Sequence, residues 1–351
     1  MSITSDAQKR VVLDATGGLN NGREAIAGAA LASLELDVLL TLVGDQEVVS
    51  RRLAQVSHDA EKIRVVHAGA RTPREAVPAE HSFETASDAV AVGLRLVKSR
   101  PGSSFVSASG ASYVVSAAYS LLERISGVRR TALAAVYPTL RRRGAVDDPF
   151  ALILDVGATT SFDASDLVTF ASMGAPYARL ISSNPRPRVA LLSNGEDPSH
   201  ASEVVREADA RLRKLDSEFH YLGLMRADHI TLGEADVIVT DGVTGDIVVR
   251  TLEGVVSTAQ ELIKRASERF RWRMGVQMLA PGLDKLRELT NWENYGGAPL
   301  LGFETPVILT QSNSGERAFL NAIRLALKVN RIDVLGAVQD SVAATLSERS
   351  R

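Results

Sequence analysis

The sequence contains no cysteine, which excludes disulfides, thiol catalysis and thiolate metal sites. It has no run of about 18 uncharged apolar residues, so we expect no segment to cross a membrane. Residues Met1 to Arg10 are polar and lack the apolar core of a secretion signal. The formal net charge is −2, which gives no global attraction to nucleic acid or to an anionic membrane. We therefore expect a cytoplasmic protein that binds no nucleic acid.

Short apolar runs alternate with helical patterns along most of the 351 residues. The runs at 38–43, 63–67 and 189–192 are typical of buried strands, and patterns such as 23–36 and 164–177 are typical of helices. Strands separated by helices indicate right-handed βαβ units. We predict one α/β domain over residues 1–351, with three α/β/α layers and a mostly parallel sheet.

Two segments interrupt this alternation. Residues 251–290 are helical in character and contain no strand pattern, with breaks at Gly275 and at Pro281-Gly282. This span predicts a helical hairpin inserted in the α/β body and projecting from it. The run Arg141-Arg-Arg-Gly144 is interpreted as a solvated loop between the two halves of the chain.

Five apolar runs end in a turn that contains glycine. A strand followed by such a turn and a helix presents unpaired N–H groups that can hold an anion. Loops that follow parallel strands gather at the carboxyl edge of a sheet. We therefore expect a small anionic or phosphate-bearing ligand there, although tight turns alone also require glycine. The turns are Asp14-Ala-Thr-Gly-Gly18, Ser107-Ala-Ser-Gly-Ala-Ser112, Asp155-Val-Gly-Ala158, Ser193-Asn-Gly-Glu196 and Asp241-Gly-Val-Thr-Gly245.

In this order and spacing, the motifs resemble those of the bacterial phosphate acyltransferases of phospholipid synthesis. The resemblance extends to Phe170-Ala-Ser-Met-Gly-Ala-Pro-Tyr-Ala-Arg-Leu180 and Tyr295-Gly-Gly-Ala-Pro-Leu-Leu-Gly302. It implies a fold like that of isopropylmalate dehydrogenase. It also implies transfer of a fatty acyl group from acyl carrier protein to inorganic phosphate, by a homodimer loosely associated with the membrane. No cofactor is expected.

The sequence departs from the family pattern at several polar positions. The asparagine and threonine of the family's loop after the third core strand are missing from Ser107-Ala-Ser-Gly-Ala-Ser112. Leu19 replaces an acid and Thr159 an asparagine. The family's lysine, helix-opening asparagine and late histidine fall at His200, Asp246 and Gln311. The glycine frame is thus retained while several polar side chains differ.

These residues define a predicted site. Backbone N–H groups at the glycines can hold phosphate and stabilise the oxyanion that forms during acyl transfer. His200 and Asp246 are the catalytic candidates, although His200 also fits a surface residue at the start of a helix. For Asp14, Asp155 and Asp241 we favour helix capping. No histidine pair has metal-ligand spacing, so no metal is expected. The predicted substrate- and phosphate-binding residues are Gly17, Gly18, Ser107, Ser109, Gly110, Ser112, Asn194, Gly195, Glu196, Asp241, Gly242 and Gly245.

Basic and apolar residues interleave near the tip of the predicted hairpin. Arg269, Phe270, Trp272 and Met274 are predicted to contact a membrane or a partner, as an interfacial helix or within a dimer interface. An acidic acyl carrier protein would dock on this segment or on Arg129-Arg130 with Arg141–Arg143. A membrane-bound acyltransferase is a further possible partner.

Three functions fit these observations. The first is acyl transfer from acyl carrier protein to phosphate. The second is a catalytically weakened relative that binds acyl carrier protein or lipid as a scaffold. The third is an acyltransferase with another acceptor, because Asp246 places a charge where the family has a neutral amide.

Overall fold

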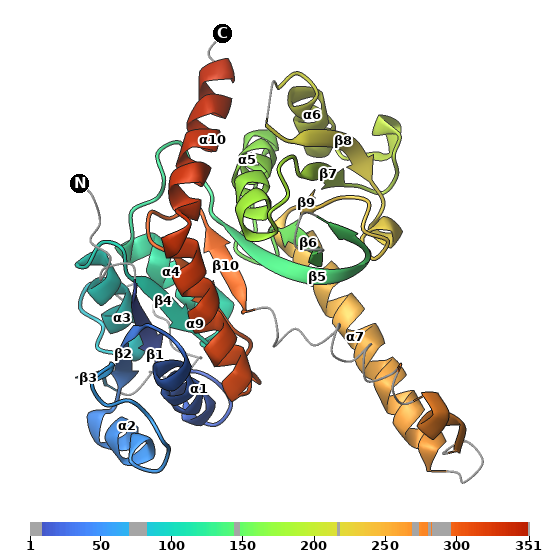
Figure 1. Ribbon diagram of the computed structural model, residues 1–351. Helices are drawn as coiled ribbons and strands as arrows, with labels where there is room; N and C mark the ends of the chain where they lie inside the picture. The colour runs from blue at the N-terminus through green and yellow to red at the C-terminus, as the bar shows by residue number, and fades with distance from the viewer. Residues whose placement is uncertain are drawn as a thin grey trace.

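The computed structural model describes residues 9–69, 83–143, 148–215, 218–268, 274–279, 282 and 296–349. These residues include eleven strands in a single sheet with helices on both faces (Figure 1). In chain order, the strands are β1 Arg10–Asp14, β2 Leu39–Gly44, β3 Ile63–His67, β4 Ser104–Ser107, β5 Ala132–Arg143, β6 Asp148–Leu154, β7 Arg188–Leu192, β8 His220–Met225, β9 Val237–Val239, β10 Ala298–Leu301 and β11 Val307–Leu309.

The sheet consists of two parallel groups joined by antiparallel strands. Its order is β3-β2-β1-β4-β11-β10-β5-β6-β9-β7-β8. The first five strands are parallel to one another, and so are the last four. Between them, β10 and β5 pair antiparallel with their neighbours. The predicted α/β class with a mostly parallel sheet is therefore confirmed.

The antiparallel strands reverse the direction of the second group relative to the first. Three antiparallel steps separate β11 from β6. Each step between neighbouring strands also adds a twist of roughly 20–25°. The four steps from β4 to β6 thus rotate the two groups by roughly a right angle. The carboxyl ends of the two groups consequently form two loop clusters, where the sequence predicted one.

Two buried apolar clusters lie on the two faces of the sheet. Strand residues alternate between them: Val11, Leu13 and Leu152 belong to one, and Val12 and Ile153 to the other. Helices α1, α2, α5, α6, α9 and α10 contribute to the first cluster, and α3, α4 and α7 to the second. The helices are α1 Arg23–Glu35, α2 Gln46–Leu53, α3 Ala89–Lys98, α4 Ala111–Leu121, α5 Ala164–Ile181, α6 Glu203–Leu212, α7 Gly242–Ser267, α9 Glu316–Arg331 and α10 Val334–Arg349.

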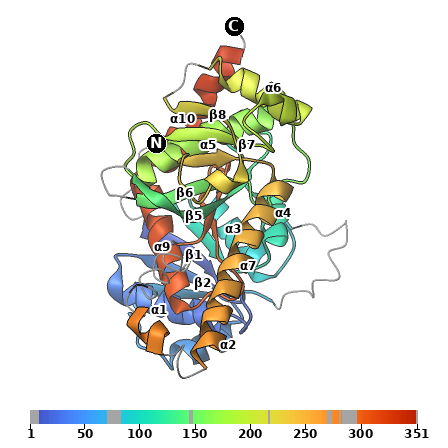
Figure 2. The same cartoon turned by 90° about the vertical axis from the view of Figure 1, so that its right-hand side faces the viewer.

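Helix α7 begins on the sheet and then leaves the body of the protein. Val248, Val249 and Leu252 pack on the second apolar cluster, and the rest of the helix projects outward (Figures 1 and 2). Residues 274–279 are again helical. Of the predicted hairpin at 251–290, residues 269–273, 280–281 and 283–290 lie outside the described residues. The hairpin and the single domain stay predictions.

The prediction of a loop at Arg141-Arg-Arg-Gly144 is wrong, because its three arginines belong to a strand. Strand β5 continues to Arg143, which pairs with Asp148 at the start of β6. Leu140 is 79% exposed and Arg141 is exposed as well, so a charged residue at this point of the strand meets no buried face. Strands β5 and β6 therefore pair antiparallel, and this pairing is one of the three antiparallel steps of the sheet.

Candidate functional site

The first loop cluster consists of residues 14–19, 107–110 and 310–315, which follow β1, β4 and β11. At its centre is Asp14, whose side chain is fully buried. The carboxylate accepts hydrogen bonds from the N–H and hydroxyl of Thr16 at 2.9 and 2.7 Å. It also accepts one bond each from the hydroxyls of Ser107 and Ser109, both at 2.7 Å. Asp14 thus joins two loops, and the prediction that it caps a helix is wrong.

Backbone contacts bring the three loops of this cluster together. A Cβ at Gly17 would lie 2.9 Å from the N atom of Ser109, so this contact requires glycine. The N–H of Leu19 donates to the carbonyl of Ser312 at 2.8 Å. The structure therefore brings together the predicted residues Gly17, Gly18, Ser107, Ser109 and Gly110. Ser112 lies in the first turn of α4 and is exposed.

The three helices that start at this cluster lack side-chain caps. Helices α1, α4 and α9 have the N-caps Gly22, Gly110 and Gly315, and none of the three receives a capping hydrogen bond from its N-cap side chain. Each helix start leaves N–H groups without an intrahelical partner and carries a partial positive charge. Helices α2, α3, α5, α6 and α7, by contrast, are capped by the side chains of Asp45, Asp88, Asp163, Ser202 and Asp241.

Two buried hydroxyl groups in the same cluster have no hydrogen-bond partner. They belong to Thr310 and Ser314, which are 8% and 5% exposed. The N–H of Thr310 bonds to the carbonyl of Ser107, which places this residue at the base of the cluster. Buried hydroxyls are normally paired. Unpaired hydroxyls beside three uncapped helix starts therefore favour a polar, anionic ligand at this position. The turn motifs carried no signal for either residue.

The second loop cluster consists of residues 155–159 and 240–246, which follow β6 and β9. Its centre is another fully buried aspartate, Asp155. It accepts hydrogen bonds from the N–H groups of Leu133, Ala158 and Thr159 and from the Thr159 hydroxyl, at 2.8–2.9 Å. Burial raises the pKa of the Asp155 carboxyl group, and these bonds oppose the rise. The helix cap predicted for Asp155 is therefore also wrong.

The start of α7 packs directly against this second centre. A Cβ at Gly245 would lie 1.9 Å from the carbonyl oxygen of Asp155, and one at Gly242 would lie 2.7 Å from Oδ2 of Asp155. Both glycines are therefore needed for close packing. Asp241 accepts hydrogen bonds from the N–H groups of Val243 and Thr244 at 3.0 Å, which confirms the predicted helix cap. The α7 N-terminus thus already holds a carboxylate.

Asp246 lies beside the turn at Gly157, where a Cβ in place of the glycine hydrogen would be 3.9 Å from Oδ1 of Asp246. Its two carboxylate oxygens accept bonds from Nε of Arg250 at 2.8 and 2.7 Å. These bonds and the negative charge raise the pKa of Arg250. The charge that Asp246 introduces is therefore balanced within one turn of the helix.

Helix α7 connects the two loop clusters. Two turns beyond Asp246, the carboxylate of Glu253 accepts a hydrogen bond of 2.8 Å from the side-chain amide of Gln311, in the loop after β11. Seven residues of α helix span roughly 10 Å. Asp246, Arg250 and Glu253 therefore form a charged stripe along α7 that extends from the second cluster to the first.

The remaining predicted residues lie farther along the second parallel group. Gly195 is buried under the ring of His200, while Asn194, Glu196 and His200 are exposed. The Glu196 carboxylate lies 3.8 Å from Nδ1 of His229, in the turn after β8. Glu196 is thus directed toward the turn after β8. A catalytic role for His200 stays a prediction.

The predicted membrane or partner contact falls mostly outside the described residues. Arg269, Phe270 and Trp272 lie there, whereas Met274 is in a helical segment and 55% exposed. Within the described ranges, no helix is long and apolar enough to span a membrane. The same residues contain no cluster of three or more metal-ligating side chains.

The fold is shared with phosphotransacylases. A phosphotransacetylase from Streptococcus pyogenes superposes with a TM-score of 0.59 at 18% identity, covering 93% of this chain and 98% of that one. The phosphotransacetylase EutD from Staphylococcus aureus gives a TM-score of 0.57 at 16% identity, covering 93% and 95%. The class is thus an α/β protein with the phosphotransacylase fold.

Sequence comparison identifies the family. Residues 9–336 match the family described as "Fatty acid synthesis protein". The phosphate acyltransferase of Thermoanaerobacter pseudethanolicus is 31% identical over 343 residues, which are 97% of this chain and 99% of that protein. The phosphate acyltransferase of Myxococcus xanthus is 34% identical over 327 residues, covering 91% and 89%. The chain belongs to this phosphate acyltransferase family and is an acyltransferase.

Proposed function

We propose that the protein transfers a fatty acyl group from acyl carrier protein to inorganic phosphate, and that the acyl phosphate serves phospholipid synthesis. The names of the relatives support phosphate as the acceptor. The family description supports a fatty acyl group. Acyl carrier protein as donor follows from the resemblance of the sequence motifs.

The first loop cluster is our proposed phosphate site. The observation that carries this assignment is the meeting of three helix starts without side-chain caps beside the unpaired hydroxyls of Thr310 and Ser314. Helix starts of this kind bind phosphate through backbone N–H groups. The second loop cluster is a poorer phosphate site, because Asp241 occupies the α7 N-terminus and Asp246 adds a further acidic side chain.

The reaction needs no covalent enzyme intermediate. An oxygen of bound phosphate attacks the thioester carbon, so that a C–O bond forms, and the C–S bond then breaks. The thiolate leaves with the electron pair and takes up a proton from solvent. The protein holds phosphate beside the thioester and stabilises the oxyanion with N–H donors. We place the thioester along the α7 stripe between the two clusters.

The charge pair on α7 bears on the identity of the acceptor. Asp246 alone would repel phosphate, but the bonds from Arg250 balance its charge. Phosphate therefore remains our preferred acceptor over a neutral alcohol or amine. His200 is exposed and lies in the turn whose Glu196 contacts His229, so we assign it no step.

Helix α7 is also our proposed partner surface. Its residues Val255 and Leu262 are 63% and 61% exposed, and Met278 beyond it is 84% exposed. Val255 and Leu262 are seven residues apart and share one face of the helix. We propose that this face contacts a second copy of the chain, and that the tip contacts the membrane surface or a membrane-bound acyltransferase.

The proposed reaction is tested by measuring thiol release from acyl carrier protein charged with a fatty acyl group, with and without phosphate. We expect release that depends on phosphate. Thr310→Val combined with Ser314→Ala should raise the KM for phosphate roughly tenfold, because two hydrogen-bond donors are lost. Ser103→Ala is the matched control, since Ser103 is also a buried unpaired hydroxyl but precedes β4 at the opposite edge of the sheet.

The alternatives give different results in the same assay. Binding of the charged carrier without turnover would support a scaffold. Release that requires an alcohol or amine would support another acceptor. An unchanged KM for phosphate in the folded double variant would contradict the proposed location, even if the reaction itself is confirmed.

A further inference from the structure

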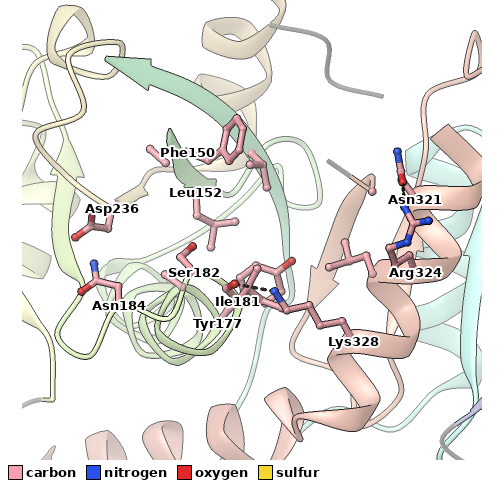
Figure 3. A pocket seen from close by; sticks show the side chains of 15 residues that line it. Phe150, Leu152, Tyr177, Ile181, Ser182, Asn184, Asp236, Asn321, Arg324 and Lys328 are labelled. Carbon is pink, nitrogen blue, oxygen red and sulfur yellow. Dashed lines mark hydrogen bonds between the residues drawn. The ribbon is translucent and has the colours of Figure 1, made fainter. Parts of the chain in front are cut away.

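A cavity lies on the face of the sheet opposite α7. Its volume is about 280 Å³, near the lower end of small-molecule pockets. Its floor is formed by β5 and β6 and its walls by α5 and α9 (Figure 3). The walls part here because α5 packs against α6 and α10, whereas α9 packs against α1. The cavity therefore lies where the helices that cover the two parallel groups of strands separate.

The interior of this cavity is largely apolar. Val136 and Leu152 lie on the floor, Ile181 is at the end of α5, and Leu325 is on α9. Phe150 closes one end (Figure 3). Apolar surface that lines an open cavity remains in contact with water, so an alkyl chain that displaces this water gains free energy. The lining therefore selects a hydrocarbon group.

One wall of the cavity carries two cations on successive turns of α9. Arg324 and Lys328 are four residues apart and lie on the same side of the helix. Nζ of Lys328 donates to the carbonyl of Ile181 at 2.8 Å. Arg324 bonds to Asn321 and, at 3.3 Å, to the exposed carboxylate of Glu35. An exposed ion pair of this kind contributes little to the free energy of folding, so Arg324 can exchange Glu35 for the anionic group of a ligand.

The acidic side chain on the opposite side of the cavity already has a cationic partner. Asp236 accepts bonds from the N–H of Arg188 at 2.6 Å and from its guanidinium at 3.1 Å. Among the described lining residues, the other charged side chains are Arg324 and Lys328. The cavity therefore combines an apolar floor with a cationic wall.

We propose that this cavity binds a single-chain amphiphile with an anionic head. The alkyl chain lies on Val136, Leu152 and Ile181, and the carboxylate or phosphate head bonds to Arg324 and Lys328. The site is separate from the proposed phosphate site, since no described lining residue of the cavity belongs to the first loop cluster. Its occupancy does not depend on the proposed reaction.

The test is calorimetric titration of the full-length protein with dodecanoate and with dodecyl phosphate, below their micelle concentrations. We expect saturable binding of one molecule per chain. Ile181→Trp should weaken both ligands at least tenfold by filling the tail site. Arg324→Gln should weaken both anions while leaving dodecanol unaffected. Arg331→Gln, an exposed arginine on the same helix outside the cavity, is the matched control.

The two probes distinguish the possible heads: a preference for dodecanoate indicates a free fatty acid, and a preference for dodecyl phosphate an acyl phosphate. Competition of either probe by inorganic phosphate alone would place binding in the first loop cluster and overturn the proposal. A diazirine-bearing alkyl carboxylate provides a second measurement on the unmutated protein. It should label peptides that contain residues 150–152 or 177–181. Labelling confined to α7 or to the loop clusters would also overturn it.

Discussion

The two loop clusters are both organised around a buried aspartate, but the helices that follow them differ in whether a carboxylate caps the N-terminus. In each, a fully buried aspartate at the end of a central strand accepts four hydrogen bonds and fixes the loops around it. Asp14 draws three of its four donors from hydroxyl groups, on Thr16, Ser107 and Ser109. Asp155 draws three of its four from backbone N–H groups.

The helices that leave the two clusters differ as well. At the first loop cluster they start at glycines, so none of the three N-cap residues supplies a side-chain cap. At the second, Asp241 caps α7 with a carboxylate. We therefore propose that glycine at the N-cap, in place of aspartate, allows the first loop cluster to attract an anion.

Removing the two central aspartates should produce the largest effects. Asp155→Ala leaves three N–H groups without this partner, two of them buried and one partly buried, and we expect a loss of roughly 3–5 kcal/mol in unfolding free energy. Asp14→Ala should cost less, roughly 1–3 kcal/mol, because hydroxyl groups can rotate to other acceptors. Urea unfolding of both variants measures the difference. Equal losses would show that the type of donor does not matter.

The second prediction converts the first cluster into a copy of the second. Gly110 has ordinary extended dihedral angles (φ −53°, ψ 130°), so Gly110→Asp introduces a carboxylate cap without backbone strain. We expect unfolding free energy to stay level or rise by about 0.5–1 kcal/mol. The KM for phosphate should rise roughly 10- to 100-fold, since the cap competes for the N–H groups and repels the anion. Gly110→Ser, which caps without charge, is the control; equal effects would exclude electrostatics.

The buried carboxyl group at the second cluster should give a measurable pH dependence. Burial raises the pKa of Asp155 in the folded state. The folded chain therefore holds this proton at pH values where the unfolded chain has lost it. The contribution of the group is fully present below its unfolded pKa of about 3.9 and is lost as pH rises through the folded pKa. As pH rises through this window, the unfolding free energy of the wild type should thus fall relative to that of Asp155→Asn. A wild-type unfolding free energy that instead rises with pH relative to that of Asp155→Asn would mean that the hydrogen bonds outweigh burial.

The smallest effect is expected at Asp246. Asp246→Asn removes a charge that Arg250 already balances, and an exposed pair is worth roughly 0.2–1 kcal/mol. The KM for phosphate should therefore fall by no more than about fivefold. Arg250→Gln should act in the opposite direction, because it leaves Asp246 unpaired. Steady-state kinetics of the two variants at several phosphate concentrations provide the check. A fall of a hundredfold for Asp246→Asn would place phosphate at the second cluster.

The sequence predicted much of the fold, because buried strands such as 189–192 are short apolar runs between helical patterns. It did not predict β8, β10 or the full length of β5. Strand β10 contains Pro299, and the end of β5 is three arginines, so neither shows an apolar alternation. The helix after Val334 was also missed. Pairing with a neighbouring strand, rather than local preference, determines β10 and the end of β5.

The site was predicted in part for the same reason. Gly17, Gly18 and Gly110 were found because turn motifs are local in sequence. The bonds from Ser107 and Ser109 to Asp14 join residues more than ninety positions apart, and no local pattern shows them. Thr310 and Ser314 carry no motif at all. Their relevance depends on burial and on the absence of a partner, which only the three-dimensional arrangement reveals.

The position of β11 has a consequence for how the chain can be divided. Residues 307–309 pair with β4, some two hundred residues earlier, and the loop after them supplies one wall of the first cluster. During synthesis, the first loop cluster therefore cannot form until almost the whole chain has been made. A fragment that stops before β11 should contain Asp14, Ser107 and Gly110 and still lack the proposed phosphate site. Adding residues 296–349 as a separate peptide would be the direct way to restore it.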